Sequence, residues 1–158
     1  MTNLHPIAVT ALDVAPRRLS SSYPEPFASL MQGRVKRQLG EVFGLTKFGV
    51  NLTRLEPGAI SSIRHTHSEQ DEFIYVLSGQ PVLVTDQGEV TLEPGMCAGF
   101  KAGNGESHQL ANRTGEPVLY LEVGDRTSGD HVHYPQDDLQ AVRDSQGWKF
   151  LHKDGRPY

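Results

Sequence analysis

The sequence has little cysteine and no long apolar run. The one cysteine, Cys97, excludes an intramolecular disulfide and cannot form a thiolate metal site by itself, and its neighbours Met96 and Ala98 predict a buried side chain. No apolar stretch approaches the roughly 18 residues of a membrane-spanning helix. The N-terminus lacks the basic start and apolar core of a secretion signal. We therefore expect a cytoplasmic protein that has no membrane partner.

The sequence also lacks a large excess of one sign of charge. Nineteen acidic and fifteen basic residues give a net charge of -4. The basic residues are scattered, apart from a short group of Arg34, Lys36 and Arg37, and no helix-turn-helix pattern is present. Nucleic acid is therefore not an expected partner, because nucleic-acid binding requires a concentrated basic surface.

Glycine and proline are plentiful, with 16 and 10 residues, and they separate short apolar runs. The runs follow one another at about ten-residue spacing with no helical pattern between them. They are FGVNLTRL (48–55), FIYVLS (73–78), PVLVT (81–85), EVTL (89–92), CAGFK (97–101), HQLAN (108–112) and PVLYLEV (117–123). Such a series predicts an all-β sandwich or small barrel of antiparallel strands.

The length of 158 residues suits one domain with a single core. We divide it into an N-terminal arm at 1–45, a barrel core at about 46–124 and a C-terminal tail at 125–158. One or two helical turns are expected between Pro24 and Gln38. A short helix over Asp137 to Arg143 is expected in an otherwise irregular tail.

The two ends of the chain are expected to pack against the barrel or a second subunit. The first 23 residues contain Pro6 and Pro16 and predict an extended arm. Trp148, Phe150 and Leu151 make the tail too apolar to remain undocked. Open barrels expose sheet edges and faces, and an extended arm can cross onto a neighbour, so we expect a homodimer.

The stretch RHTHSEQDEFIYVLSG, residues 64–79, is the strongest chemical signal. His65 and His67 project to the same side of one strand because strand side chains alternate. Glu72 begins the next strand, and His108 begins a later one and could add a third imidazole. Nitrogen and carboxylate donors together suit Zn, Mn, Fe, Ni or Cu better than Ca or Mg.

Other interpretations of these residues stay open. Asp71 and Glu69 compete with Glu72 for the carboxylate role, although alternation places Asp71 on the opposite face and Glu69 falls in the loop. The same side chains could instead form a hydrogen-bonded polar patch that holds no metal. The second His-x-His, at 131–133, has no partner residues at a matching spacing and is interpreted as a surface or loop feature.

Two motifs in the sequence resemble those of the cupin superfamily. The first comprises Gly58, His65-Thr66-His67, Glu72 and Gly79. The second comprises Gly95, Lys101-Ala102-Gly103, His108 and Asn112. In the first motif the spacing from the glycine to the histidines is one residue longer than usual. In the second, Lys101 replaces a proline and the turn is two residues longer.

The resemblance implies a double-stranded β-helix, the jelly-roll barrel of cupins. It also implies one divalent transition metal (Zn, Mn, Fe or Ni) held by His65, His67, Glu72 and His108, with open coordination positions at the barrel mouth. The whole pattern is similar to small bacterial single-domain cupins, some of which are labelled sugar-phosphate isomerases.

The expected function is that of a mononuclear metal enzyme acting on a small polar or sugar-like molecule. The metal would act as a Lewis acid in an isomerase- or epimerase-type reaction. Such a reaction needs a base, and Lys101 and Glu106 near the site mouth are the candidate catalytic residues. Two alternatives remain open at this point, an Fe(II)-dependent dioxygenase and a non-catalytic module that binds a small metabolite. The sequence leaves the metal and the substrate undetermined.

Overall fold

The computed structural model describes residues 5–19 and 21–158, and strands dominate this part of the chain. The strands are β1 (Arg34–Gln38), β2 (Phe48–Leu55), β3 (Thr66–His67), β4 (Glu72–Ser78), β5 (Val82–Thr85), β6 (Gly88–Thr91), β7 (Cys97–Phe100), β8 (His108–Ala111), β9 (Val118–Asp125), β10 (His131–Tyr134), β11 (Leu139–Asp144) and β12 (Gly147–Leu151). The helices are short: η1 (Ala11–Asp13), η2 (Ala28–Met31) and α1 (Leu39–Val42).

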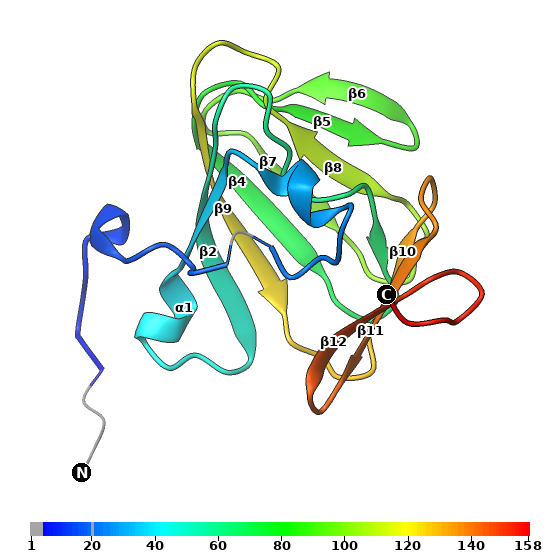
Figure 1. Ribbon diagram of the computed structural model, residues 1–158. Helices are drawn as coiled ribbons and strands as arrows, with labels where there is room; N and C mark the ends of the chain where they lie inside the picture. The colour runs from blue at the N-terminus through cyan, green and yellow to red at the C-terminus, as the bar shows by residue number, and fades with distance from the viewer. Residues whose placement is uncertain (1–4, 20) are drawn as a thin grey trace.

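The strands form three antiparallel sheets that together make the barrel (Figure 1). The largest has the order β1-β2-β9-β4-β7, the second β12-β11-β10-β3 and the third β6-β5-β8. The seven apolar runs noted in the sequence all lie on strands, with ends that differ by one or two residues. The predicted all-β jelly-roll class is therefore confirmed.

Strand alternation separates an apolar end of the barrel from a polar end. On β9, Val118 and Tyr120 face inward and are buried, and Glu122 follows on the same face. On β4, Ile74 pairs with Glu122, so Glu72 faces inward one step beyond Ile74. The apolar end is a core of residues from both the largest and the third sheet: Leu55, Ala59, Ile74, Val76, Leu83, Leu92, Leu110, Val118 and Tyr120. The polar end holds the two carboxylates.

The C-terminal tail differs from the prediction, because it is a sheet. The helix expected over Asp137 to Arg143 is wrong, since β11 occupies this stretch and pairs with β10 and β12. Leu139 and Ala141 are buried at period two, which is a strand pattern. The tail is docked, as expected, because β10 also pairs with β3 of the barrel.

The segment from Pro24 to Gln38 is helical only in part. The 3-10 helix η2 covers Ala28–Met31 and supplies one of the expected helical turns, whereas Arg34–Gln38 is a strand paired with β2. Gly33, at φ 78°, turns the chain between the two elements in a conformation that favours glycine. The partner strand thus overrides the local spacing of apolar residues.

The described part of the N-terminal arm starts outside the barrel and reaches it beside α1 and β1 (Figure 1). Ile7 and Leu12 are exposed, and the arm is held by backbone contacts such as the Arg17 amide donating to the Lys36 carbonyl at 2.8 Å. Aromatic packing begins at Tyr23, whose ring lies against that of Phe150 with centroids 5.4 Å apart. The expectation that the arm packs against the barrel or a second subunit also concerns residues 1–4 and 20, which lie outside the described residues. The homodimer stays a prediction.

The outer face of β4 and β7 is exposed and carries the cysteine. Cys97 is exposed, so the prediction of a buried side chain is wrong. Its strand alternates, and Ala98 instead of Cys97 faces the core. Phe73 and Tyr75 lie on the face opposite Glu72, and both are exposed. Within residues 5–19 and 21–158, no helix has the length and apolar character to cross a membrane.

Candidate metal centre

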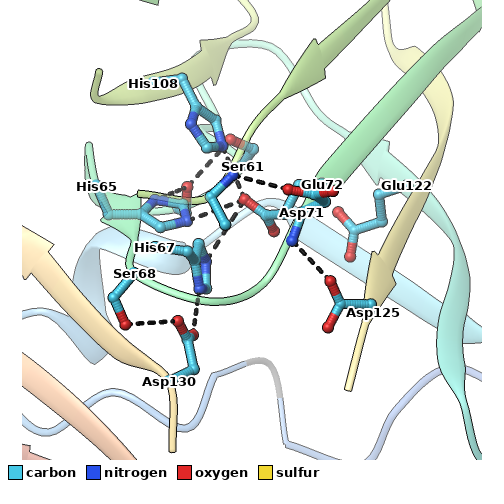
Figure 2. Close-up of polar contacts among 12 residues, drawn as sticks. Ser61, His65, His67, Ser68, Asp71, Glu72, His108, Glu122, Asp125 and Asp130 are labelled. Atoms are coloured by element: carbon cyan, nitrogen blue, oxygen red, sulfur yellow. Dashed lines mark hydrogen bonds and ion pairs between the residues drawn. The ribbon is translucent and has the colours of Figure 1, made fainter. Parts of the chain in front are cut away.

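Three short backbone segments bring the candidate ligands together at the polar end of the barrel (Figure 2). His65 and His108 face each other in a β-bridge, with the His108 amide donating to the His65 carbonyl at 2.9 Å. His67 lies on β3, and Glu72 is the first residue of β4. The loop between His67 and Glu72 is short, so the carboxylate returns to the side from which the imidazoles project.

The imidazole rings converge on one carboxylate oxygen. Oε2 of Glu72 lies 3.4 Å from Nε2 of His65, 3.5 Å from Nε2 of His67 and 2.9 Å from Nε2 of His108. The ligand atoms of His65, His67 and Glu72 all lie within 4.8 Å of one another. His108 joins this group through its contact with Glu72. Its ring also stacks on Phe100, with centroids 3.6 Å apart.

Hydrogen bonds at Nδ1 orient two of the rings. Nδ1 of His65 is 2.8 Å from the Ile63 carbonyl oxygen, and Nδ1 of His67 is 2.5 Å from Oδ2 of Asp130. Both partners only accept, so the hydrogen of each neutral ring is on Nδ1 and the lone pair is on Nε2. The lone pairs therefore point toward Glu72. This is the tautomer that ligates a metal through Nε2.

Asp130 is fully buried and ties the tail to the site. It accepts hydrogen bonds from the Glu69 amide at 2.9 Å and the Ser68 hydroxyl at 3.3 Å, besides its bond to His67. Burial acts to raise the pKa of Asp130, but these donors, His67 first, hold it below its usual value. Asp130 is therefore an ionised acceptor that holds His67 in place. Sequence reasoning missed it, because it lies 63 residues from His67.

The carboxylate and the imidazoles of the cluster change one another's pKa values. Burial acts to raise the pKa of Glu72, but contacts with His108 and His65 hold it well below the usual range. Burial acts to lower the pKa of His67, but Asp130 and Glu72 raise it above its usual value. The pKa of His108 is lowered, chiefly by burial. Glu72 is thus a carboxylate at neutral pH.

The arrangement fits a transition metal. Oε2 of Glu72 is buried without a well-aligned hydrogen-bond donor, although three imidazole nitrogens surround it. Acceptor atoms this close need a cation between them, either a proton or a metal ion. Ligand bonds of about 2.1 Å place neighbouring donor atoms about 3.0–3.4 Å apart at angles between 90° and tetrahedral. The observed contacts of 2.9–3.5 Å lie near that range.

The competing acids are engaged elsewhere. The Asp71 carboxylate accepts the Ala102 amide at 2.8 Å, and Glu69 is exposed in the loop. His131 and His133 are exposed on β10 as predicted for a surface feature, although they lie on a strand instead of a loop. The two acids and the two histidines of β10 therefore do not face the histidine cluster.

The cluster opens into a cavity of about 270 Å³. Besides the four candidate ligands, polar and aromatic side chains from four parts of the chain line it, among them Tyr23, Arg34, Lys36, Glu122, Tyr134 and Trp148. Glu122 is the second carboxylate of this wall. Its Oε1 accepts from Nζ of Lys36 at 2.5 Å and Nδ2 of Asn51 at 2.8 Å, and its Oε2 accepts from the Tyr120 hydroxyl at 3.3 Å.

The two candidate catalytic residues lie beside the ligand cluster but outside the main cavity. Lys101 and Glu106 line a small crevice that is also lined by His67, Glu72 and His108, and neither lines the main cavity. Sequence reasoning overlooked Glu122, for which a signal existed. A polar residue in phase with Val118 and Tyr120 breaks the inward apolar pattern of PVLYLEV.

Comparison with known proteins agrees with this geometry. The Cupin domain family matches residues 51–124. A solved sugar phosphate isomerase of the cupin superfamily, from Silicibacter pomeroyi, shares 45% sequence identity with a TM-score of 0.90, and the match covers 96% of each chain. The chain belongs to the cupin superfamily.

Two further solved structures resemble this cupin over shorter stretches. A candidate sugar phosphate isomerase from Acidithiobacillus ferrooxidans is 30% identical with a TM-score of 0.72, over 79% of this chain and 80% of that one. The polyketide cyclase RemF from Streptomyces resistomycificus is 25% identical with a TM-score of 0.61, over 75% and 78%. No curated protein matches the sequence significantly. A cupin fold hosts many reactions, so the site must carry the functional argument.

Proposed function

We propose that this cupin is a mononuclear metal enzyme that isomerises a small sugar-like molecule. The observation that carries the proposal is the convergence of three imidazole Nε2 atoms on Oε2 of Glu72 in the wall of a cavity. The similar proteins from Silicibacter pomeroyi and Acidithiobacillus ferrooxidans, described as a sugar phosphate isomerase and a candidate one, support the reaction class.

His65, His67, Glu72 and His108 would hold the metal ion. When bound, a divalent transition metal there would supply Lewis acidity that polarises a carbonyl or hydroxyl oxygen of the substrate. Asp130 keeps the His67 ring in its ligating orientation. Three nitrogens and one carboxylate suit Zn, Mn, Fe or Ni, and they do not select among these metals.

Two tyrosines provide neutral hydrogen-bonding groups beside the ligand cluster, where the Tyr134 ring centroid lies 5.9 Å from that of His65. The hydroxyls of Tyr23 and Tyr134 lie 3.4 Å apart, and both rings are largely buried in the cavity wall. Burial raises the pKa of both phenols, so they stay protonated at neutral pH. A protonated phenol both donates and accepts, which suits the hydroxyl groups of a sugar-like molecule.

Glu122 is our proposed proton-transfer group. It pairs across the sheet with Ile74, so its side chain and that of Glu72 share the inner face on adjacent strands. Diagonal neighbours of this kind lie roughly 7–8 Å apart, which leaves room for a substrate carbon between them. Lys36 and Asn51 fix Oε1, while Oε2 has only the longer contact to Tyr120. Oε2 is therefore the atom placed to take a carbon-bound proton.

Replacing Glu122 with glutamine is expected to lower turnover on the order of 100- to 10,000-fold, because glutamine keeps the shape but cannot accept a proton. Metal content should stay unchanged, since Glu122 does not contact the histidines. The assay follows isomerisation and deuterium uptake by NMR in D2O with a panel of pentose and hexose phosphates. Glu106→Gln and Lys101→Met are the matched controls. Loss of turnover in either control with full activity in Glu122→Gln would contradict the assignment.

Metal binding is testable with the sole tryptophan. The Trp148 ring centroid lies 6.2 Å from that of His67, so Ni²⁺ or Co²⁺ at the site should quench its fluorescence. We expect saturable quenching at one equivalent in metal-stripped protein. His67→Ala should abolish it, and His133→Ala, which removes an exposed imidazole, should not.

Metal content of untagged protein, measured by mass spectrometry, decides among the reaction classes. Near one zinc, manganese or nickel per chain supports Lewis-acid isomerisation. Near one iron would favour the dioxygenase alternative, which uses the same ligands. Protein that holds no metal and takes up none on titration would overturn the enzyme proposal in favour of a binding module.

A further inference from the structure

An open cleft of about 720 Å³ adjoins the metal cavity at the barrel mouth. The two spaces share six lining residues: Arg17, Ser22, Asn51, Glu72, Glu122 and Trp148. The cleft is further lined by Arg126 and Arg143. A molecule that reaches Glu72 from this side therefore spans both spaces.

Ion pairs neutralise some of the charged groups in the cleft and the inner cavity. Arg126 forms an ion pair with Glu41 and also donates to the Leu45 carbonyl. Lys36, from the inner cavity, forms an ion pair with Glu122. The four groups neutralise each other in pairs and leave no net charge.

The remaining acids are also accounted for. Glu72 is enclosed by the histidines. The Asp125 carboxylate accepts the backbone amides of Asp71 and Thr127, both at 2.8 Å. Burial acts to raise the pKa of Asp125, but these amide bonds hold it below its usual value. Asp125 thus adds one negative charge whose strongest contacts are to the backbone.

Two guanidinium groups remain. Among the residues that the structure describes, neither Arg17 nor Arg143 forms an ion pair. Arg143 pairs across β11 and β12 with Trp148, and its guanidinium carbon lies 5.7 Å from the centroid of that ring. The Arg17 backbone is fixed to Lys36 on β1. Arg34 adds a positive charge deeper in the cavity, where its Nη1 donates to the Ser61 carbonyl. With the ion pairs and the ligand carboxylate Glu72 set aside, Arg17 and Arg143 exceed Asp125 by one positive charge at the mouth.

We propose that this cleft binds the phosphate group of the substrate through Arg17 and Arg143. The inference rests on the proposed function, in which the other end of the substrate lies at the histidine cluster. Two cations match the charge of a phosphate monoester, and guanidinium groups bind phosphate oxygens through paired N–H donors. Trp148, which lines both spaces, lies between the phosphate position and His67. The preferred substrate is then a small phosphorylated sugar, and its neutral counterpart is a poor ligand.

Inorganic phosphate is the probe, and binding to the metal-loaded protein is measured by calorimetry. We expect saturable binding that weakens at least 10-fold in both Arg17→Gln and Arg143→Gln. Arg113→Gln is the matched control, because Arg113 is exposed and paired with Glu89 away from the cleft. Glucose 6-phosphate should likewise compete with phosphate, whereas glucose should not.

The other outcomes distinguish failure of the cleft assignment from failure of the proposed function. Phosphate bound at the metal would be insensitive to the arginine variants and lost in Glu72→Gln, which overturns the cleft assignment. Tighter binding of acetate than of phosphate would indicate that the cleft binds a carboxylate group of the substrate instead of a phosphate. If neither anion binds, the cleft is not an anion-binding site. If the protein takes up no metal but binds phosphate through Arg17 and Arg143, the cleft assignment stands and the proposed function is wrong.

Discussion

Replacing Glu72 with glutamine is expected to remove metal binding and, with it, any turnover. Glutamine has nearly the same shape, so the change isolates the charge that the three imidazoles surround. Loss of even an indirect partner of a metal ligand costs about 10–100-fold in affinity. Removing a ligand should therefore cost on the order of 100-fold or more. Metal content after dialysis and Trp148 quenching by Ni²⁺ are the measurements.

Glu69→Gln is the matched control for Glu72→Gln. Glu69 lies three residues before Glu72 in the loop that leads into β4, carries the same charge and is exposed. It should keep full metal content. Equal metal content in the two variants would show that the carboxylate is not a ligand, and the interpretation of the cluster as a hydrogen-bonded polar patch would then be preferred.

Gly79→Ala is expected to destabilise the fold by about 3 kcal/mol or more. Gly79 has φ 79°, where a side chain costs about 1–2 kcal/mol. An added Cβ would also lie 2.8 Å from the Pro117 carbonyl oxygen and 2.9 Å from Cα of Val118, both of which are backbone atoms. The buried Val118 cannot move without disturbing the core. The midpoint of urea unfolding measures the effect.

Gly58→Ala separates the two causes of this destabilisation. Gly58 has φ 82°, close to the value at Gly79, but an added Cβ there would meet nothing within 4 Å. We expect a loss of about 1–2 kcal/mol from the backbone conformation alone. Equal losses at both positions would contradict the proposed clash with Pro117 and Val118.

Much of the barrel follows from local pattern. The strands from Phe48 to Asp125 are predicted well because their apolar runs alternate and end at turn residues. The tail is missed because its alternation is interrupted by polar residues. Val132 and Tyr134 are buried on β10, as are Leu139 and Ala141 on β11, but the intervening PQDD conceals the pairing.

The candidate site, like the fold, is predicted from the sequence only where its residues belong to local motifs. The four residues that the cupin motifs single out meet in space, because each motif lies on segments that pair directly. Asp130, Glu122 and Arg143 come from strands or turns whose positions depend on tertiary pairing. Spacing along the sequence does not encode such contacts. Lys101 and Glu106 were chosen by their nearness in sequence to His108, which did not place them in the main cavity.

Because β10 pairs with β3, docking of the C-terminal sheet and cation binding at the candidate metal centre are expected to affect each other. Asp130 immediately precedes β10 and holds His67, so undocking of the tail would release one proposed ligand. A cation that binds only the docked form stabilises docking by an amount that grows with the logarithm of its free concentration. If the proposed metal binds, we expect docking of the tail to depend on metal availability and its locally open form to become less populated as the site fills.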